Sequence, residues 1–119
     1  MGHVRVAVDI YNPADSTISA RVQDALVDTG ATRTTIPRAL ANHLGLQIVG
    51  TQTVHTASGP ESIDQSFARI VLDGKQSYND IWISDAYQGV LIGVVTLEAM
   101  SLGVDPKNGR LIDVESLLL

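Results

Sequence analysis

The chain has 119 residues, a length from which we expect one domain. Its formal net charge is −5, from eight Lys and Arg against thirteen Asp and Glu, and its scattered cations form no patch for nucleic acid. Cysteine is absent, which excludes disulfides, thiolate metal sites and a cysteine nucleophile. Because nothing resembles a signal peptide and no stretch approaches the roughly 18 uninterrupted apolar residues of a membrane span, we expect a soluble cytoplasmic protein with no membrane partner.

Two extended runs open the chain. Residues His3–Ile10 alternate between apolar and polar side chains, which predicts a half-buried strand, and Asn12-Pro13 predicts a turn after it. A second strand is predicted over Thr17–Val27. It ends in three apolar residues, Ala25–Val27, without alternation, which is typical of a strand buried on both faces.

A short helix is predicted over Arg38–Leu44. Pro37 stands at the first helical position, where its missing N–H costs nothing, and Gly45 is suited to the left-handed conformation that ends a helix. This helix follows a Thr-rich stretch that we interpret as a loop.

The middle of the chain, Gln47–Asp85, is rich in Val, Ile and Thr and predicts further strands. Two hairpin turns are expected within it, at Ala57–Pro60 and at Asp73-Gly74. Phe67 and Trp82 lie in alternating runs, so we expect both side chains in the core.

The last third begins with a second apolar strand end, Val90–Gly93. A helix is predicted over Val94–Leu102, with Gly103 as its cap, and a hairpin turn is predicted at Pro106–Gly109. The chain closes with an extended run, Arg110–Val114, and an apolar tail. The predicted architecture is therefore mostly β, with one or two short helices.

The two helical regions are part of an internal repeat. The first copy begins with the apolar strand end Leu26–Asp28, continues through a loop and a helix, and ends at Leu44–Leu46. The second copy has the same order of elements, from Leu91–Gly93 to Leu102–Val104. Two copies are too few for a solenoid. We interpret them as two halves of one small domain, 1–119.

The motif that carries chemistry is Asp28-Thr29-Gly30. By itself Asp-Thr-Gly is turn chemistry, since Asp accepts backbone N–H bonds and Gly supplies positive φ. Here, however, Asp28 directly follows a buried apolar run, and a segment with a similar ending, Val90–Gly93, comes some sixty residues later.

This combination resembles the retropepsin-like aspartic proteases, the single-domain family that includes retroviral proteases. Asp28–Ala31 matches the catalytic loop of that family, Thr56–Pro60 the tip of its flap hairpin, and Leu91–Gly93 its second signature. The ending Leu102–Leu111 is similar to that of prokaryotic members. The resemblance implies an all-β, single-domain retropepsin-like barrel with a flap hairpin. It also implies catalytic roles for Asp28, Thr29 and Gly30, and substrate binding by Ala31, Thr56, Ala57, Ser58, Gly59, Leu91 and Ile92.

The implied reaction needs two carboxyl groups, one to take a proton from water and one to polarise the scissile carbonyl. Two such groups about 3 Å apart share a proton. The chain has only one Asp in the required context, and the matching position of the second half is Gly93. The resemblance therefore implies a homodimer with Asp28 from each subunit at the two-fold axis, Thr29 bonding across it and Gly30 allowing close approach.

The sequence departs from the family in two places. Val94 follows Gly93, where retroviral members have an Arg that ties the subunits together, and Pro60 lacks the N–H with which a flap grips a peptide. An extended peptide is still expected to bind as an added strand. The subunits are expected to be held by Leu111–Leu119 across the axis, alongside the run Val4–Ile10, unless this segment folds back on its own core.

Other chemistries lack a motif. His3, His43 and His55 have no metal-ligand spacing, so neither a metal nor a cofactor is expected. There is no nucleophile elbow and no glycine-rich phosphate loop. The predicted function is an aspartic endopeptidase. The alternatives are a peptide-binding module that keeps the fold with little or no hydrolysis, and a structural β domain.

Overall fold

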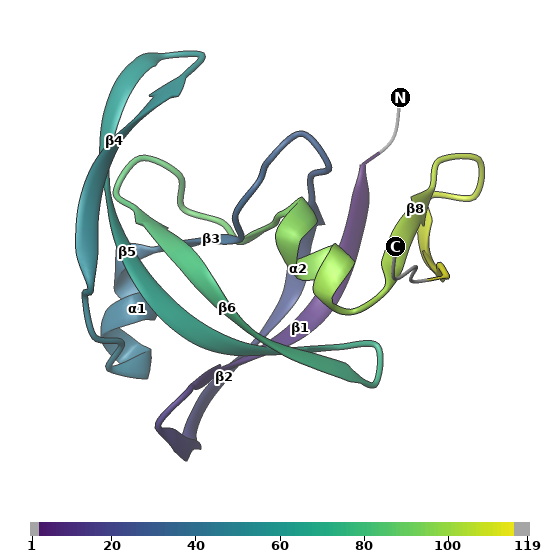
Figure 1. Ribbon diagram of the computed structural model, residues 1–119, viewed down its shortest axis with the longest axis horizontal. Coiled ribbons are helices and arrows are strands. Elements are labelled where there is room, and N and C mark those ends of the chain that lie inside the picture. Colours follow the sequence, from purple (N-terminus) through teal and green to yellow (C-terminus); the bar gives the residue numbers. More distant parts are fainter. Residues whose placement is uncertain (1–2, 116–119) are drawn as a thin grey trace.

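The computed structural model describes residues 3–115, which form nine strands and two short helices (Figure 1). The predicted all-β architecture is confirmed. In chain order the elements are β1 (Val4–Asn12), β2 (Asp15–Val27), β3 (Thr35–Pro37), α1 (Arg38–Leu44), β4 (Gly50–Thr56), β5 (Gly59–Leu72), β6 (Lys75–Ser84), β7 (Leu91–Ile92), α2 (Val94–Ala99), β8 (Leu102–Asp105) and β9 (Arg110–Asp113).

Seven of these strands form one sheet in the order β1-β2-β7-β3-β6-β5-β4. The sheet closes because β1 also pairs with β5, at Asp9–Tyr11. The alternation of β1 explains this placement, since Val4, Val8 and Ile10 are buried and the residues between them are more exposed. A register shift between Val6 and Val8 bends the strand.

The core is built of aliphatic side chains from both halves of the chain. Its buried members are Val4, Val8, Ile10, Ala25, Val27, Ile36, Ala41, Leu44, Ala68, Ile70, Leu72, Ile81, Ile83, Val90, Ile92, Leu97, Met100 and Leu102. The strand end of β2 lies in the middle of this core, where β2 pairs in parallel with β7 through Leu26 with Leu91 and Val27 with Ile92. This pairing brings the residues after the two apolar runs, Asp28 and Gly93, side by side.

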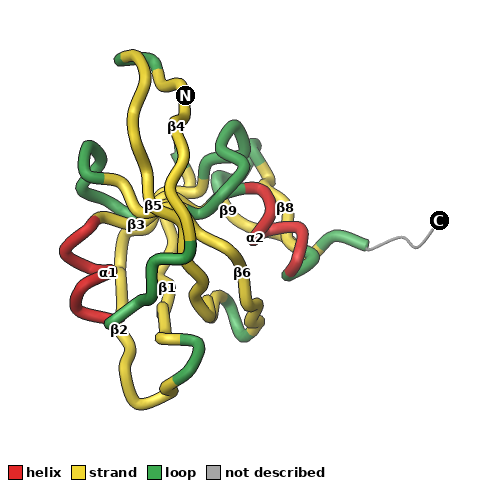
Figure 2. Tube along the Cα trace, turned by 60° about the vertical axis from the view of Figure 1, so that its left-hand side comes forward, coloured by secondary structure: helices red, strands yellow, loops and turns green. Residues whose placement is uncertain are grey.

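The β4–β5 hairpin projects from the barrel (Figures 1 and 2). Its turn is Ala57-Ser58. The Thr56 hydroxyl closes this turn, because it donates a hydrogen bond to the Gly59 carbonyl at 2.8 Å and accepts one from the Ser58 N–H at 3.1 Å. Gly59 has φ 110°, a conformation that favours glycine. The predicted turn is therefore confirmed but shorter than expected, because Pro60 already belongs to β5.

Four local expectations were wrong. Trp82, expected in the core, is half-buried and lines a cleft. Pro37 ends β3 and caps α1 instead of occupying its first turn, because Thr35 to Pro37 pair with β6. The second helix ends at Ala99, and Gly103 lies in β8, because Leu102 turns into the core as a strand residue. Phe67 is 51% exposed, since its neighbours along β5 point inward and leave it on the outer face.

The C-terminal segment folds back on its own subunit as far as it is described. β9 pairs with β8, Leu111 packs against the core, and the Val114 N–H bonds to the Ser101 carbonyl at 2.9 Å. Within the chain, the run Val4–Ile10 pairs with β2 and, at Asp9 and Ile10, with β5. Its place at a subunit interface stays a prediction. The apolar tail 117–119 lies outside the described residues.

Candidate active site

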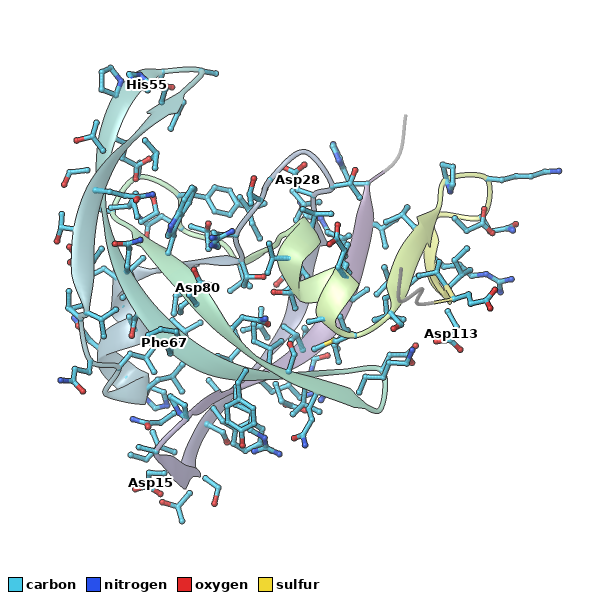
Figure 3. The ribbon with its side chains drawn as sticks, in the orientation of Figure 1. Asp15, Asp28, His55, Phe67, Asp80 and Asp113 are labelled. Atoms are coloured by element: carbon cyan, nitrogen blue, oxygen red, sulfur yellow. The ribbon has the colours of Figure 1, made fainter. Side chains whose placement is uncertain are left out.

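Asp28 stands at the end of β2, in a loop that holds its carboxylate. Its N–H donates to the Ile92 carbonyl at 3.0 Å, which ties the loop to β7. The Gly30 N–H donates to the Asp28 Oδ1 at 2.9 Å, and the Ala31 N–H to the Asp28 carbonyl at 3.1 Å. Figure 3 shows Asp28 on the loop after β2 and His55 near the tip of the projecting β4–β5 hairpin. Asp28 is half-buried, so part of the residue stays exposed.

Gly93 lets the second half of the chain approach this loop. An ideal Cβ at Gly93 would lie 2.5 Å from the Arg33 carbonyl carbon and 2.7 Å from the Thr32 oxygen, closer than real Cβ atoms come to backbone. The Val94 N–H donates to the Ala31 carbonyl at 2.8 Å. The start of α2 therefore rests directly on the loop that follows Asp28.

Thr34 joins the two halves through its side chain. Its hydroxyl accepts a hydrogen bond from the Gly93 N–H at 3.1 Å and is bonded to the Thr96 hydroxyl at 2.6 Å. Thr34 and Thr96 are 1% and 0% exposed. This pair was not predicted, since nothing in the sequence distinguishes Thr34 from the other threonines of its stretch.

A cleft of about 700 Å³ lies between this loop and the hairpin. It brings together five of the residues predicted to lie at the site: Gly30, Ala31, Thr56, Ser58 and Leu91. These come from three separated segments of the chain, so the closing of the barrel assembles the cleft. Its size is within the range of small-molecule and peptide-side-chain sites.

The other predicted residues lie elsewhere. Asp28 and Thr29 line a second cleft of about 470 Å³, together with residues of β1 and the β8–β9 hairpin. Ala57 and Gly59 are in or beside the hairpin turn, outside the cleft lining. Ile92 is 0% exposed in the core, so its side chain cannot contact substrate, and that expectation is corrected. Ile92 supports the loop through its backbone carbonyl, which accepts the hydrogen bond from the Asp28 N–H.

The larger cleft also contains polar residues that were not predicted from the sequence. Ser84 donates its hydroxyl to the Glu61 Oε2 at 2.6 Å and accepts from the N–H groups of Ala86 and Tyr87, both at 3.1 Å. Glu61, Ser84 and Tyr87 all line the cleft. In the sequence these residues stand out only by their position in a strand-like run and in the loop after it. That position does not show that their side chains face the same cleft.

An ion-pair cluster holds the loop between β6 and β7 that carries Tyr87. Arg38 donates from Nε and Nη2 to both carboxylate oxygens of Asp85, at 3.0 and 3.1 Å, and from Nη1 to Asp64 at 2.6 Å. The Arg38 hydrogen bond lowers the pKa of Asp85. The pKa of Asp64 is lowered first by the Thr51 hydroxyl and then by Arg38.

Two further features are absent from the part of the chain that the structure describes. Within 3–115 no group of three or more His, Asp and Glu side chains is arranged to hold a metal ion. No helix in the same range is both long and apolar enough to cross a membrane.

Comparison with known proteins places these features in a family. Residues 14–99 match the family model described as "gag-polyprotein putative aspartyl protease". The match covers Asp28, the hairpin and Gly93. The chain therefore belongs to the retropepsin-like aspartic proteases. Among curated proteins no sequence matches it.

Solved structures show the same fold at low sequence identity. The retroviral protease-like domain of Ddi1 from Leishmania major is 18% identical, with a TM-score of 0.62 and coverage of 92% of this chain and 88% of that one. The EIAV protease complexed with the inhibitor HBY-793 is 17% identical, with a TM-score of 0.61 and coverage of 82% and 86%. A retropepsin-like aspartic protease from Rickettsia conorii is 18% identical, with a TM-score of 0.60 and coverage of 87% and 77%.

Proposed function

We propose that the protein is an aspartic endopeptidase that is active as a homodimer, with Asp28 of each subunit in a shared dyad. The observation that carries the proposal is the place of Asp28. It follows the buried end of β2, is held by a backbone N–H, is only half-buried, and is the only acid among the residues that line its cleft. A second carboxylate must therefore come from another subunit.

The chemistry follows from two carboxyl groups sharing one proton. The ionised one takes a proton from water, and the protonated one donates a hydrogen bond to the scissile carbonyl as the water attacks. The Gly30 N–H holds Oδ1 of Asp28, which leaves Oδ2 for water or substrate. An ideal Cβ at position 30 would lie 3.2 Å from Oδ1, so glycine gives the loop the room that this contact needs.

The substrate proposed for this site is an extended peptide. The larger cleft adjoins the loop at Gly30 and Ala31 and is roofed by the β4–β5 hairpin, so a chain crossing the loop passes beneath the hairpin. Such a chain can bond to backbone along its length while alternate side chains enter pockets. Pro60 has no N–H to contribute, which leaves the turn residues and β4 for this role.

The test is hydrolysis of an unstructured polypeptide at acid and neutral pH, with and without a pepstatin-type inhibitor. We expect cleavage that the inhibitor blocks and that Asp28→Asn abolishes, while the fold is retained. Losses of several orders of magnitude are expected because the amide cannot act as a base. Binding of the polypeptide without cleavage would instead support a peptide-binding module.

A further inference from the structure

A carboxylate lies in an otherwise mostly apolar part of the larger cleft. Glu61 is on β5, three residues after the hairpin turn, and is half-buried. Val54, Ile63, Trp82 and Leu91 line the same cleft. A charged group in such surroundings has less water around it than at the open surface, so its interactions with a ligand are strengthened.

No cation neutralises Glu61 within the described chain. Its hydrogen bond is to the neutral Ser84 hydroxyl, at 2.6 Å. Arg33 also lines the cleft, but its Nε is paired with Asp80 at 2.7 Å. Among residues 3–115, no Lys, Arg or His nitrogen lies within 4.0 Å of the Glu61 carboxylate. Glu61 is therefore a carboxylate without an ion-pair partner among the described residues, in a cleft whose other charged side chain, Arg33, is paired elsewhere.

The Glu61 carboxylate is also held in place. Ser84 binds one oxygen and is itself fixed by the N–H groups of Ala86 and Tyr87. The loop that carries those two residues is held by the ion pair of Arg38 with Asp85. A carboxylate fixed before the ligand arrives loses little conformational entropy on binding.

We propose that Glu61 makes this cleft a subsite for a Lys or Arg side chain of the peptide substrate. The aliphatic stem packs on Val54, Trp82 and Leu91, and the cationic head reaches the Glu61 carboxylate. Long cationic side chains bury their stems on apolar surfaces in this way, and hydrogen bonds between ionised groups are about twice as strong as neutral ones. The inference rests on the proposed function, since it assumes that a peptide occupies the cleft.

Peptide binding to the Asp28→Asn variant tests this subsite without cleavage. Trp82 is the only tryptophan of the chain and lines the cleft, so its fluorescence reports occupancy. The probes are short apolar peptides in which each position in turn carries Lys, norleucine or Glu. At about pH 7.5 we expect Lys at one position to bind about tenfold more tightly than norleucine. Glu at that position is expected to bind most weakly.

Glu61→Gln, added to Asp28→Asn, is the decisive variant, because the amide oxygen still accepts the Ser84 hydrogen bond. We expect the lysine preference to fall to about twofold or less, with norleucine affinity unchanged. The matched control is Glu98→Gln, which removes one exposed negative charge on α2, away from the cleft, and is expected to keep the preference.

Equal binding of Lys and norleucine, or a lysine preference that survives Glu61→Gln, overturns the subsite. Cleavage by the wild-type chain is measured separately. If that chain cleaves without lysine preference, the subsite is wrong and the protease stands. If it binds with lysine preference but does not cleave, the protease is wrong and the subsite stands. If no peptide binds at all, the subsite is wrong.

Discussion

Replacing Gly93 with alanine tests how the two halves of the site are joined. A Cβ at this position would lie 2.5 Å from the Arg33 carbonyl carbon. Contact between carbons is favourable only at about 3.5 Å or more, so the loop and α2 must separate by roughly 1 Å. That movement stretches the bonds from the Gly93 N–H to Thr34 and from the Val94 N–H to Ala31, now 3.1 and 2.8 Å.

The expected loss of stability is the sum of two effects. Forcing an extra methyl group into a packed site costs about 1–3 kcal/mol, and weakening two hydrogen bonds costs about 0.5–1.5 kcal/mol each. Together they give a loss of about 2–6 kcal/mol, a large share of the roughly 5–15 kcal/mol that stabilises an ordinary domain. Hydrolysis is expected to fall as well, because the shift reaches the loop that holds Asp28.

Gly50→Ala is the matched control. Its Cβ would lie 2.6 Å from the Oε1 of Gln65, the far end of a flexible side chain that can turn away. Urea unfolding at one fixed protein concentration measures both variants, since an associating protein has a concentration-dependent midpoint. The reasoning is refuted if Gly93→Ala and Gly50→Ala differ by less than about 0.5 kcal/mol.

Three further predictions concern pH and the buried threonine. The hydrogen bond from Arg38 lowers the pKa of Asp85 in the folded state. The pair therefore stabilises the fold at pH values above 3.8, the ordinary pKa of the carboxyl, and this stabilisation is lost as the pH falls through the lowered pKa. In Arg38→Met the urea midpoint should therefore decrease less steeply as the pH falls below about 5 than it does in the wild type. An equally steep decrease in both proteins would contradict the role of this pair. Thr34→Val should lower the free energy of unfolding by about 1–3 kcal/mol, because it leaves the buried Gly93 N–H without its acceptor. Thermal or urea unfolding measures this loss, and a loss near zero would contradict the role of Thr34. Hydrolysis by a dyad of Asp28 that shares a proton should follow a bell with its maximum below neutrality, whereas a rate that keeps rising at high pH would contradict the shared proton.

Patterns of local sequence were enough to predict much of the fold. The alternation in β1 shows which side chains are buried, because a strand of period two has one face on the core. The apolar end of β2 predicts a strand buried on both faces, and Asp28 directly after it predicts a functional loop. These predictions depend on neighbouring residues alone. The cytoplasmic location and the single-domain organisation stay predictions.

The errors and omissions depend on contacts between distant segments. Alternation around Phe67 shows that successive side chains face opposite ways, but the face that is buried depends on which strands close the barrel. Thr34 acquires its role from Gly93, 59 residues later in the chain. Glu61 faces the cleft only because β4, β5 and β6 pair in their particular register. No local pattern carries that information.

The central claim is that two copies of Asp28 make one active site, and mixing subunits tests it most directly. Wild-type protein is mixed with Asp28→Asn at constant total concentration, left to exchange subunits, and assayed for hydrolysis. If both carboxylates are needed, mixed dimers are inactive and activity falls as the square of the wild-type fraction, to about a quarter at equal amounts. Activity that falls in direct proportion to the wild-type fraction would mean that each subunit works alone, and would contradict the account.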